Sequence, residues 1–184
     1  MNANILPTGS VYSLVADTSA VERHTLSVLV DNEPGILARI AGLFSARGFN
    51  IDSLTVSETE HEQGLSRITV VTKANLKVLV QIKRQLERLV PVHRVVDLTA
   101  TGKSLERELA LVKVAGEGDD RIEALRLADA FRAQVVDAST NSFVFEITGK
   151  PTKIEQFIAL MMPLGLVEVV RTGLAAIARG PEPM

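Results

Sequence analysis

The sequence lacks cysteine and tryptophan and is poor in aromatic residues, which make up 4% of its 184 positions. The absence of cysteine excludes a disulfide framework, a thiolate nucleophile and a cysteine-ligated metal site. Hydrophobic residues nevertheless reach 46%, an ordinary share for a folded protein. We therefore expect globular domains with cores of leucine, valine, isoleucine and alanine, and not a chain that is disordered throughout.

The chain also lacks an excess of charge of one sign. It has 20 lysine and arginine residues against 22 aspartate and glutamate residues, and both signs are mixed in each half. A ferredoxin-like nucleic-acid module would need a basic excess and stacking aromatic residues on its central strands. The expected central strands instead carry Val28, Val30, Ile68 and Val70. We therefore expect no nucleic-acid partner.

Long hydrophobic runs are missing as well. No segment approaches the roughly 18 uninterrupted apolar residues that suggest a membrane-spanning helix. Residues 1–22 lack the basic and then apolar order of a secretory signal. We expect a cytoplasmic protein without a membrane partner, in which residues 1–22 form a flexible leader.

The spacing of apolar residues predicts one order of elements that occurs twice. Apolar side chains alternate along 24–30, as in a strand, whereas Ile36, Ile40 and Phe44 recur at helical spacing. The first set is a strand at 24–30, a helix at 36–47, strands at 51–59 and 65–72, a helix at 76–90 and a strand at 92–98. The second set is a strand at 108–114, a helix at 121–131, strands at 134–139 and 142–148, a helix at 152–162 and a strand at 166–171.

This order is that of a ferredoxin-like βαββαβ domain, in which helices cover one face of an antiparallel sheet. The predicted fold class is α+β, with two such domains at 23–100 and 106–180 and a linker at 101–105. The strand at 51–59 then lies at a sheet edge, and it has no proline or lysine to block further pairing. We expect two copies to pair there as a homodimer. The alternative is a monomer whose edge is covered by the second domain.

Several residues mark the ends of the expected helices. Pro34 suits the first helical position, Gly48 suits a C-terminal end, and Asn75 suits an N-cap. In the second half, Asp119 or Asp120 is expected to cap the helix. The glycines before this helix lack the lysine of a phosphate-binding loop, and the neighbouring carboxylates would repel phosphate.

Residues that could carry catalysis are scarce. The histidines have no second metal ligand at a suitable spacing, and we interpret all three as ordinary surface or edge residues: His24, His61 and His93. The sequence contains no Gly-x-Ser-x-Gly motif. We therefore expect no catalytic residue, no metal and no cofactor on this chain.

The segment from Asp31 to Leu37 is the most informative one. It places a turn at the start of a helix, where the first amides have no intrahelical partner and the helix dipole favours an anion. Gly35 allows close approach to the backbone, and Asn32 offers a donor and an acceptor. With Ile36 and Leu37 as an apolar wall, these features suit a free amino acid with a small branched side chain. The alternative is that Asn32 or Glu33 simply caps the helix.

The run from His24 to Ile40 resembles the opening of an ACT domain, a βαββαβ module that senses amino acids. The segments 42–56, 65–69, 81–90 and 107–114 are similar to the regulatory small subunit of acetolactate synthase, also called acetohydroxyacid synthase. The run Arg-Gly-Phe-Asn-Ile at 47–51 makes this resemblance specific.

The resemblance implies a chain without an active site of its own. Its partner would be the large catalytic subunit, which holds thiamine diphosphate, Mg²⁺ and FAD and condenses pyruvate with a second 2-oxo acid. That reaction is the first step toward valine, leucine and isoleucine. The small subunit would activate the catalytic subunit and confer feedback inhibition by valine. A stand-alone amino-acid-binding ACT regulator is the alternative.

The resemblance also implies the effector residues. The family's effector turn matches Asn32, Gly35, Ile36 and Leu37, and the residues that reach the effector from the partner subunit match Asn50 and Ile51. Relatives often have serine at the position of Ala38, which could weaken one contact. The hairpin tip at 60–64 is a candidate contact with the catalytic subunit. The second domain lacks an Asn-x-x-Gly turn, so no amino-acid pocket is expected there.

Overall fold

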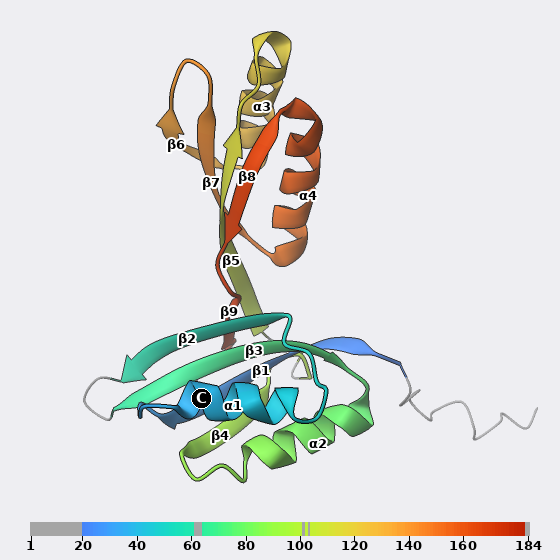
Figure 1. Ribbon diagram of the computed structural model, residues 1–184, viewed down its shortest axis with the longest axis vertical. Coiled ribbons are helices and arrows are strands. Elements are labelled where there is room, and N and C mark those ends of the chain that lie inside the picture. The colour runs from blue at the N-terminus through green and yellow to red at the C-terminus, as the bar shows by residue number, and fades with distance from the viewer. Residues whose placement is uncertain (1–19, 61–63, 101, 103, 183–184) are drawn as a thin grey trace, which may run out of the picture.

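The computed structural model describes residues 20–60, 64–100, 102 and 104–182. It contains two antiparallel sheets, each with its own helices, stacked along the long axis of the molecule (Figure 1). The strand β5 continues from the upper sheet down to the lower one (Figure 1). The predicted α+β class with two βαββαβ units is confirmed.

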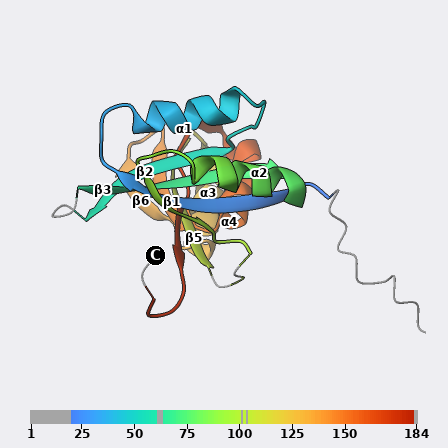
Figure 2. The same cartoon turned by 90° about the horizontal axis from the view of Figure 1, so that it is seen from below.

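The N-terminal domain has the predicted order of elements. They are β1 (Glu22–Asp31), α1 (Ile36–Ser45), β2 (Ser53–Glu60), β3 (Leu65–Ala74), α2 (Leu76–Leu86) and β4 (Val92–Asp97). The sheet order is β2-β3-β1-β4, so β2 lies at an edge as predicted. Both helices cover the same face of the sheet (Figure 2).

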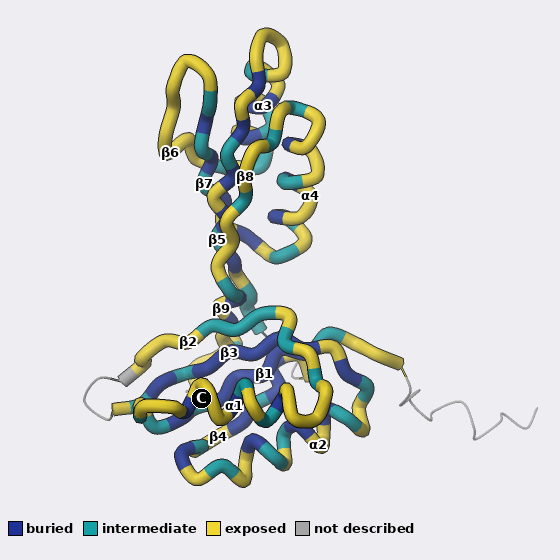
Figure 3. The backbone as a smooth tube through the Cα atoms, in the orientation of Figure 1, coloured by how far each residue is buried: buried dark blue, intermediate teal, exposed yellow. Residues whose placement is uncertain are grey.

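Alternation along the strands builds the core of this domain. On β1, Leu26, Val28 and Val30 are fully buried and belong to one cluster with the helix residues Ile40 and Phe44. Burying an aliphatic or aromatic side chain of this size contributes about 1.5–3 kcal/mol. Figure 3 shows these strands as the buried interior and the outer turns of both helices as exposed.

Two predicted helix ends are confirmed. Gly48, at φ +68, follows α1 in the left-handed conformation, and the amide of Phe49 donates to the Phe44 carbonyl at 3.0 Å. The rings of Phe44 and Phe49 also meet edge to face, as the apolar contact of this helix ending requires. The Asn75 side chain accepts a hydrogen bond from the amide of Val78 at 3.0 Å and caps α2.

Two predicted helix boundaries are wrong. The helix α2 ends at Leu86 and not at residue 90, because the chain tightens into turns before Pro91, where helical backbone is disfavoured. The first helix begins at Ile36, so Pro34 precedes the cap residue and is not the first helical residue.

The C-terminal domain repeats the order with two additions. Its elements are β5 (Ser104–Val114), α3 (Gly118–Ala130), β6 (Gln134–Ala138), β7 (Phe143–Gly149), α4 (Pro151–Met161), η2 (Met162–Leu164), β8 (Leu166–Arg171) and β9 (Ala175–Ala178). The sheet order is β6-β7-β5-β8. The strand β5 begins at Ser104, within the range expected to be a linker.

The prediction of a purely aliphatic core is wrong in this domain. Phe145 and Phe157 are fully buried and meet edge to face at 6.1 Å between ring centroids, and Phe131 packs on Phe157 at 5.5 Å. The low aromatic content of the whole chain does not predict an aromatic core, because most of the six phenylalanines are concentrated in this one domain.

The start of α3 also differs from the prediction. The helix begins at Gly118, its cap residue is Glu117, and no side chain of the described chain caps it by a hydrogen bond. Asp119 and Asp120 lie in the first turn. There they stabilise the positive end of the helix dipole without acting as caps.

The strand β9 was not predicted, and it joins the domains. It pairs with Ser104–Arg107, the first part of β5, whereas the rest of β5 pairs with β7 and β8. A third buried cluster unites Leu174 and Ala176 with Val71 and Leu98 of the N-terminal domain. The sheet face opposite α1 and α2 is therefore partly covered by the β5–β9 ribbon.

Among the described helices, none combines the length and apolar character required to cross a bilayer.

Candidate effector turn and the domain junction

The candidate effector turn connects β1 to α1 through residues 32–35. Gly35 is the cap residue of α1 and has φ +87, a left-handed conformation in which a Cβ would be strained. A Cβ built on Gly35 would meet no described atom within 4 Å. The backbone at the start of α1 therefore faces open space.

The first amides of this helix are not consumed by a capping side chain. The amide of Arg39 donates to the Gly35 carbonyl at 3.0 Å, so the preceding amides of Leu37 and Ala38 have no intrahelical acceptor. No side chain of the described chain caps α1. Glu33 instead accepts from the Arg39 guanidinium at 3.0 Å. Capping by Asn32 or Glu33, the alternative interpretation of this turn, is therefore wrong.

Neighbouring turns hold the effector turn in place. The amide of Asn32 donates to the Gly64 carbonyl at 2.7 Å, and the amide of Asp31 donates to the Pro91 carbonyl at 2.9 Å. The Asp31 carboxylate lies 2.7 Å from Nε2 of His93. These contacts tie the turn to both adjacent connections of the domain, while the Asn32 side chain is exposed.

The predicted effector residues do not all lie together in one chain. Asn32, Gly35 and Leu37 are exposed at the N-terminal end of α1, whereas Ile36 is buried in the core with 6% exposure. The helix has ten residues and a length of about 15 Å, and residues 50–51 follow its other end. A single protomer therefore presents two separate groups of candidate residues.

The second group precedes β2 and is not part of the strand, because β2 begins at Ser53. Asn50 is exposed, and its Nδ2 donates to Oδ1 of Asp52 at 2.7 Å. Its backbone carbonyl accepts from the Thr72 hydroxyl at 2.6 Å, which holds this loop against β3. Ile51 is half-buried against the domain core.

The structure describes two of the three histidines, His24 and His93. No group of three or more histidine, aspartate or glutamate side chains suited to a metal ion occurs in the described part of the chain. His24 is buried with 4% exposure and lies 3.5 Å from the Asp97 carboxylate, so its interpretation as a surface or edge residue is wrong. His93 is exposed, and His61 lies outside the described residues.

One carboxyl group has a clearly shifted pKa, and it is remote from the effector turn. The pKa of Glu168 on β8 is lowered because Lys113 donates a hydrogen bond to it at 2.7 Å and places a positive charge beside it. Both side chains are exposed on the C-terminal sheet. The pair is a surface ion pair of that domain.

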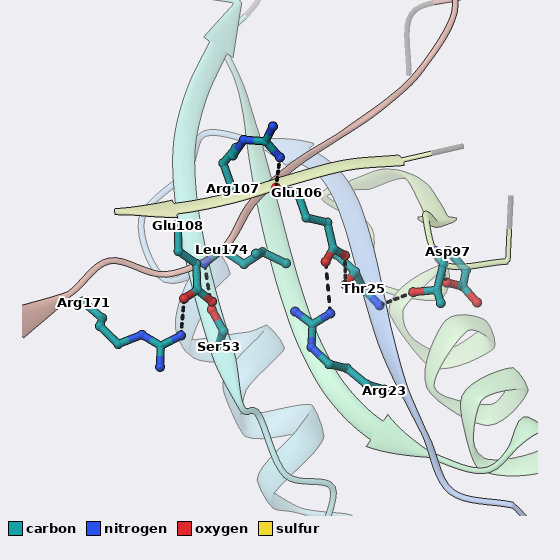
Figure 4. Close-up of polar contacts among 10 residues, drawn as sticks. Arg23, Thr25, Ser53, Asp97, Glu106, Arg107, Glu108, Arg171 and Leu174 are labelled. Carbon is teal, nitrogen blue, oxygen red and sulfur yellow. Dashed lines mark hydrogen bonds and ion pairs between the residues drawn. The ribbon is translucent and has the colours of Figure 1, made fainter. Parts of the chain in front are cut away.

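A polar network at the domain junction was missed by the sequence analysis. Glu106 accepts from Arg23 at 3.1 Å and from the Thr25 hydroxyl at 2.6 Å, and Glu108 pairs with Arg171 (Figure 4). Glu106 and Glu108 lie two positions apart on β5, so their side chains are on the same side of the strand. The predicted strand begins at residue 108 and therefore does not include Glu106.

Cavities line this junction. One of about 570 Å³ lies between β2, β3 and the start of α4, and another of about 370 Å³ lies beside Arg23 and Glu106. Neither is lined by any of the six candidate effector residues. In the described part of one chain, these cavities belong to the contact between the domains and the effector turn is an open surface.

Comparison with known proteins covers nearly the whole chain. A family model described as an AHAS small subunit-like ACT domain matches residues 26–94, and a second, described as the small subunit of acetolactate synthase, matches residues 107–180. The probable acetolactate synthase small subunit of Archaeoglobus fulgidus is 46% identical over 158 residues, which are 86% of this chain and 98% of that protein.

Two further relatives agree with this match. The acetolactate synthase small subunit of Haemophilus influenzae is 45% identical over 161 residues, which are 87% of this chain and 98% of that protein. The crystal structure of the acetolactate synthase small subunit of Thermotoga maritima superposes with a TM-score of 0.79 at 38% identity. That superposition covers 88% of this chain and 99% of the Thermotoga chain.

Proposed function

Because this chain belongs to the family of acetolactate synthase small subunits, we propose that it binds the catalytic subunit of that enzyme and regulates it. The catalytic subunit would hold thiamine diphosphate, Mg²⁺ and FAD and would condense pyruvate with a 2-oxo acid. This chain would raise its activity and make it sensitive to valine. The observation that carries the effector part is the uncapped start of α1 at Gly35, which is open to solvent.

The effector turn suits the main-chain groups of valine. The carboxylate would accept from the amides of Leu37 and Ala38, where the helix dipole also favours negative charge. The side chain of Asn32 would bind the ammonium group through its oxygen. Leu37, with 41% exposure, would contact the isopropyl group. Ile36 supports the turn from the core and is not a ligand in this proposal.

A second copy of the chain would complete the site. The candidate edge β2 pairs only with β3 in the described chain. The chain runs from Asn50 through β2 to the β2–β3 connection, where the Gly64 carbonyl accepts a hydrogen bond from the amide of Asn32. Two β2 strands that pair antiparallel about a two-fold axis would bring Asn50 and Ile51 of one copy beside the effector turn of the other.

The surface beside β2 supports this dimer. Leu37 and Val56 are 41% and 45% exposed on the helix side of the edge. Ala38 and Gly42 lie four positions apart on α1, and both are exposed. Small residues at this spacing let a second α1 approach closely, and the exposed aliphatic groups would be removed from water.

Regulation would follow from differential binding. If valine favours one arrangement of the dimer, and the catalytic subunit binds the two arrangements unequally, the two sites are coupled by about 1–3 kcal/mol. The hairpin tip, of which residues 61–63 lie outside the described chain, remains our proposed contact with the catalytic subunit.

The substitution Gly35→Asp tests the effector site. A carboxylate at this position would repel the valine carboxylate, and we expect binding to weaken by about a hundredfold in calorimetry. Gly180→Asp is the matched control, because Gly180 also has positive φ and open space but follows β9 in the C-terminal domain. Valine binding that survives in Gly35→Asp with an unchanged dissociation constant would exclude the turn.

The partner role has a separate test. Purified chain should raise the turnover of the catalytic subunit at micromolar concentration and co-purify with it. Valine binding without any effect on turnover would instead favour the stand-alone ACT regulator.

A further inference from the structure

A third cavity lies between the outer face of the N-terminal sheet and the β5–β9 ribbon. Its volume is about 300 Å³. Its polar lining consists of Thr55, Ser57, Thr59, Arg67, Thr69 and Arg107. The apolar wall comes from the ribbon, including Ile177 of β9. The lining contains hydroxyl and guanidinium groups and, among the described residues, no carboxylate.

Strand register places these polar groups on one face. Ser57 is opposite Arg67 and Thr55 is opposite Thr69 in the β2–β3 pair. Side chains of directly opposite residues lie on the same side of a sheet. This is the face away from α1 and α2, because the intervening Ile68 belongs to the helix-side core.

The C-terminal domain closes the cavity from the other side. Arg107 comes from the ribbon opposite Ala175, and one of its terminal nitrogens donates to the Glu106 carbonyl at 2.8 Å (Figure 4). Gly173 crosses β2 so closely that a Cβ there would lie 2.3 Å from the Thr55 hydroxyl. The cavity therefore exists only when the two domains are packed together.

Two donors in this cavity lack a partner. The Thr55 hydroxyl and Nε of Arg67 are buried, and neither has a hydrogen-bond partner within the described chain. Buried polar groups are normally hydrogen-bonded, and an unsatisfied group is costly. Both residues line the same cavity, and these two polar groups are not satisfied by hydrogen bonds within the described chain.

We propose that this cavity binds a phosphoryl group, as inorganic phosphate or as part of a small phosphorylated metabolite. Two guanidinium groups balance the charge of a dianion, and guanidinium is well suited to bidentate contact with phosphate. Hydroxyls of the lining can donate to the remaining oxygens, of which a phosphoryl group offers more than a carboxylate does. The bound group would bridge β2 and β3 to the ribbon and hold the domains together.

This site is separate from the effector turn, because the cavity lining includes neither Gly35 nor Asn32. Failure of the proposed valine site would therefore leave this inference unaffected.

Titration of the full-length chain with inorganic phosphate, followed by calorimetry and by ³¹P line broadening at constant ionic strength, tests the proposal. We expect saturable binding that weakens at least about tenfold in Arg67→Gln and in Arg107→Gln. Arg88→Gln, an exposed arginine after α2, is the matched control and should bind within about twofold of the unmodified chain. Arg107 is exposed, so its variant remains informative if Arg67→Gln fails to fold.

Three outcomes would overturn the proposal. They are the absence of saturable phosphate binding, binding that is as tight in both cavity variants as in the unmodified chain, and saturable binding of acetate or pyruvate but not of phosphate. Parallel titrations with ribose 5-phosphate distinguish a phosphorylated metabolite from free phosphate, since tighter binding of the sugar phosphate would identify the former.

Discussion

The two domains share one order of elements but differ where the first strand turns into the first helix. In the N-terminal domain four residues, 32–35, make this turn, and Gly35 leaves the helix start open. In the C-terminal domain three residues, 115–117, make it, and Asp119 and Asp120 already occupy the first helical turn. The positive end of the second helix dipole is therefore matched by the chain itself.

The space above the second turn is also filled. A Cβ on Gly116 would lie 2.7 Å from the Leu164 carbonyl, and the amide of Ala115 donates to the Gly165 carbonyl at 2.8 Å. The short helix η2 thus covers the turn that is bare in the other domain. In this topology, the turn between the first strand and the first helix can therefore bind an anion only where no other group caps or covers it.

The largest expected effect comes from adding a methyl group to each turn. Gly116→Ala forces a Cβ against backbone atoms, and we expect it to lower the free energy of unfolding by about 3 kcal/mol. Gly35→Ala meets no neighbour and should lose about 1 kcal/mol, from its left-handed conformation alone. Urea unfolding of both variants measures this difference. Equal losses would mean that the second turn is no more closed than the first.

The next effect comes from giving the open turn the acidic character of the closed one. Ala38→Asp places a carboxylate in the first turn of α1, where it should stabilise the helix by about 0.3–1 kcal/mol. The same charge should repel the valine carboxylate and weaken binding at least about tenfold. Thermal unfolding and calorimetry should therefore move in opposite directions. A variant that is more stable and binds valine as before would contradict our placement of the ligand.

Much of the fold could be predicted because its elements have clear periodicity. The valine-rich segment at 166–171 predicts β8 at its observed bounds. The strand β9 has four residues, three of them alanine, and its partner is the start of β5 in a distant part of the sequence. Short alanine-rich segments have low strand propensity, and only tertiary pairing makes this one a strand.

The candidate site could be predicted in part. The open start of α1 could be predicted because a glycine before a helix leaves the backbone accessible, while its role as the effector site stays a prediction. The helical spacing that links Ile36 to Ile40 also predicts that Ile36 is buried in the core. The sequence analysis instead places Ile36 in the apolar wall of the ligand site. The cavity between the N-terminal sheet and the β5–β9 ribbon could not be predicted, because it depends on the register of β2 with β3 and on the packing of the ribbon.

A smaller effect should show whether the polar network at the domain junction stabilises the contact between the two domains. Glu106→Gln weakens the carboxylate contacts to Arg23 and Thr25, and we expect a loss of about 1 kcal/mol in urea unfolding. Glu123→Gln, which removes an exposed ion pair with Arg126 within α3, should cost less than about 0.5 kcal/mol. If the Glu106 variant is as stable as this control, the network does not hold the domains together.

The smallest effect concerns the surface pair Lys113 and Glu168. The pKa of Glu168 is lowered in the folded chain, so its contribution to stability is present at neutral pH and is lost as the pH falls below about 4. Solvent screens this exposed pair, and its share of the acid sensitivity is therefore small. In Lys113→Gln the urea midpoint should fall slightly less between neutral pH and about pH 3 than in the unmodified chain. Lys153→Gln is the control, because Lys153 donates to the Thr148 carbonyl and not to a carboxylate. Identical acid profiles for the two variants would show that the lowered pKa of Glu168 does not contribute to stability.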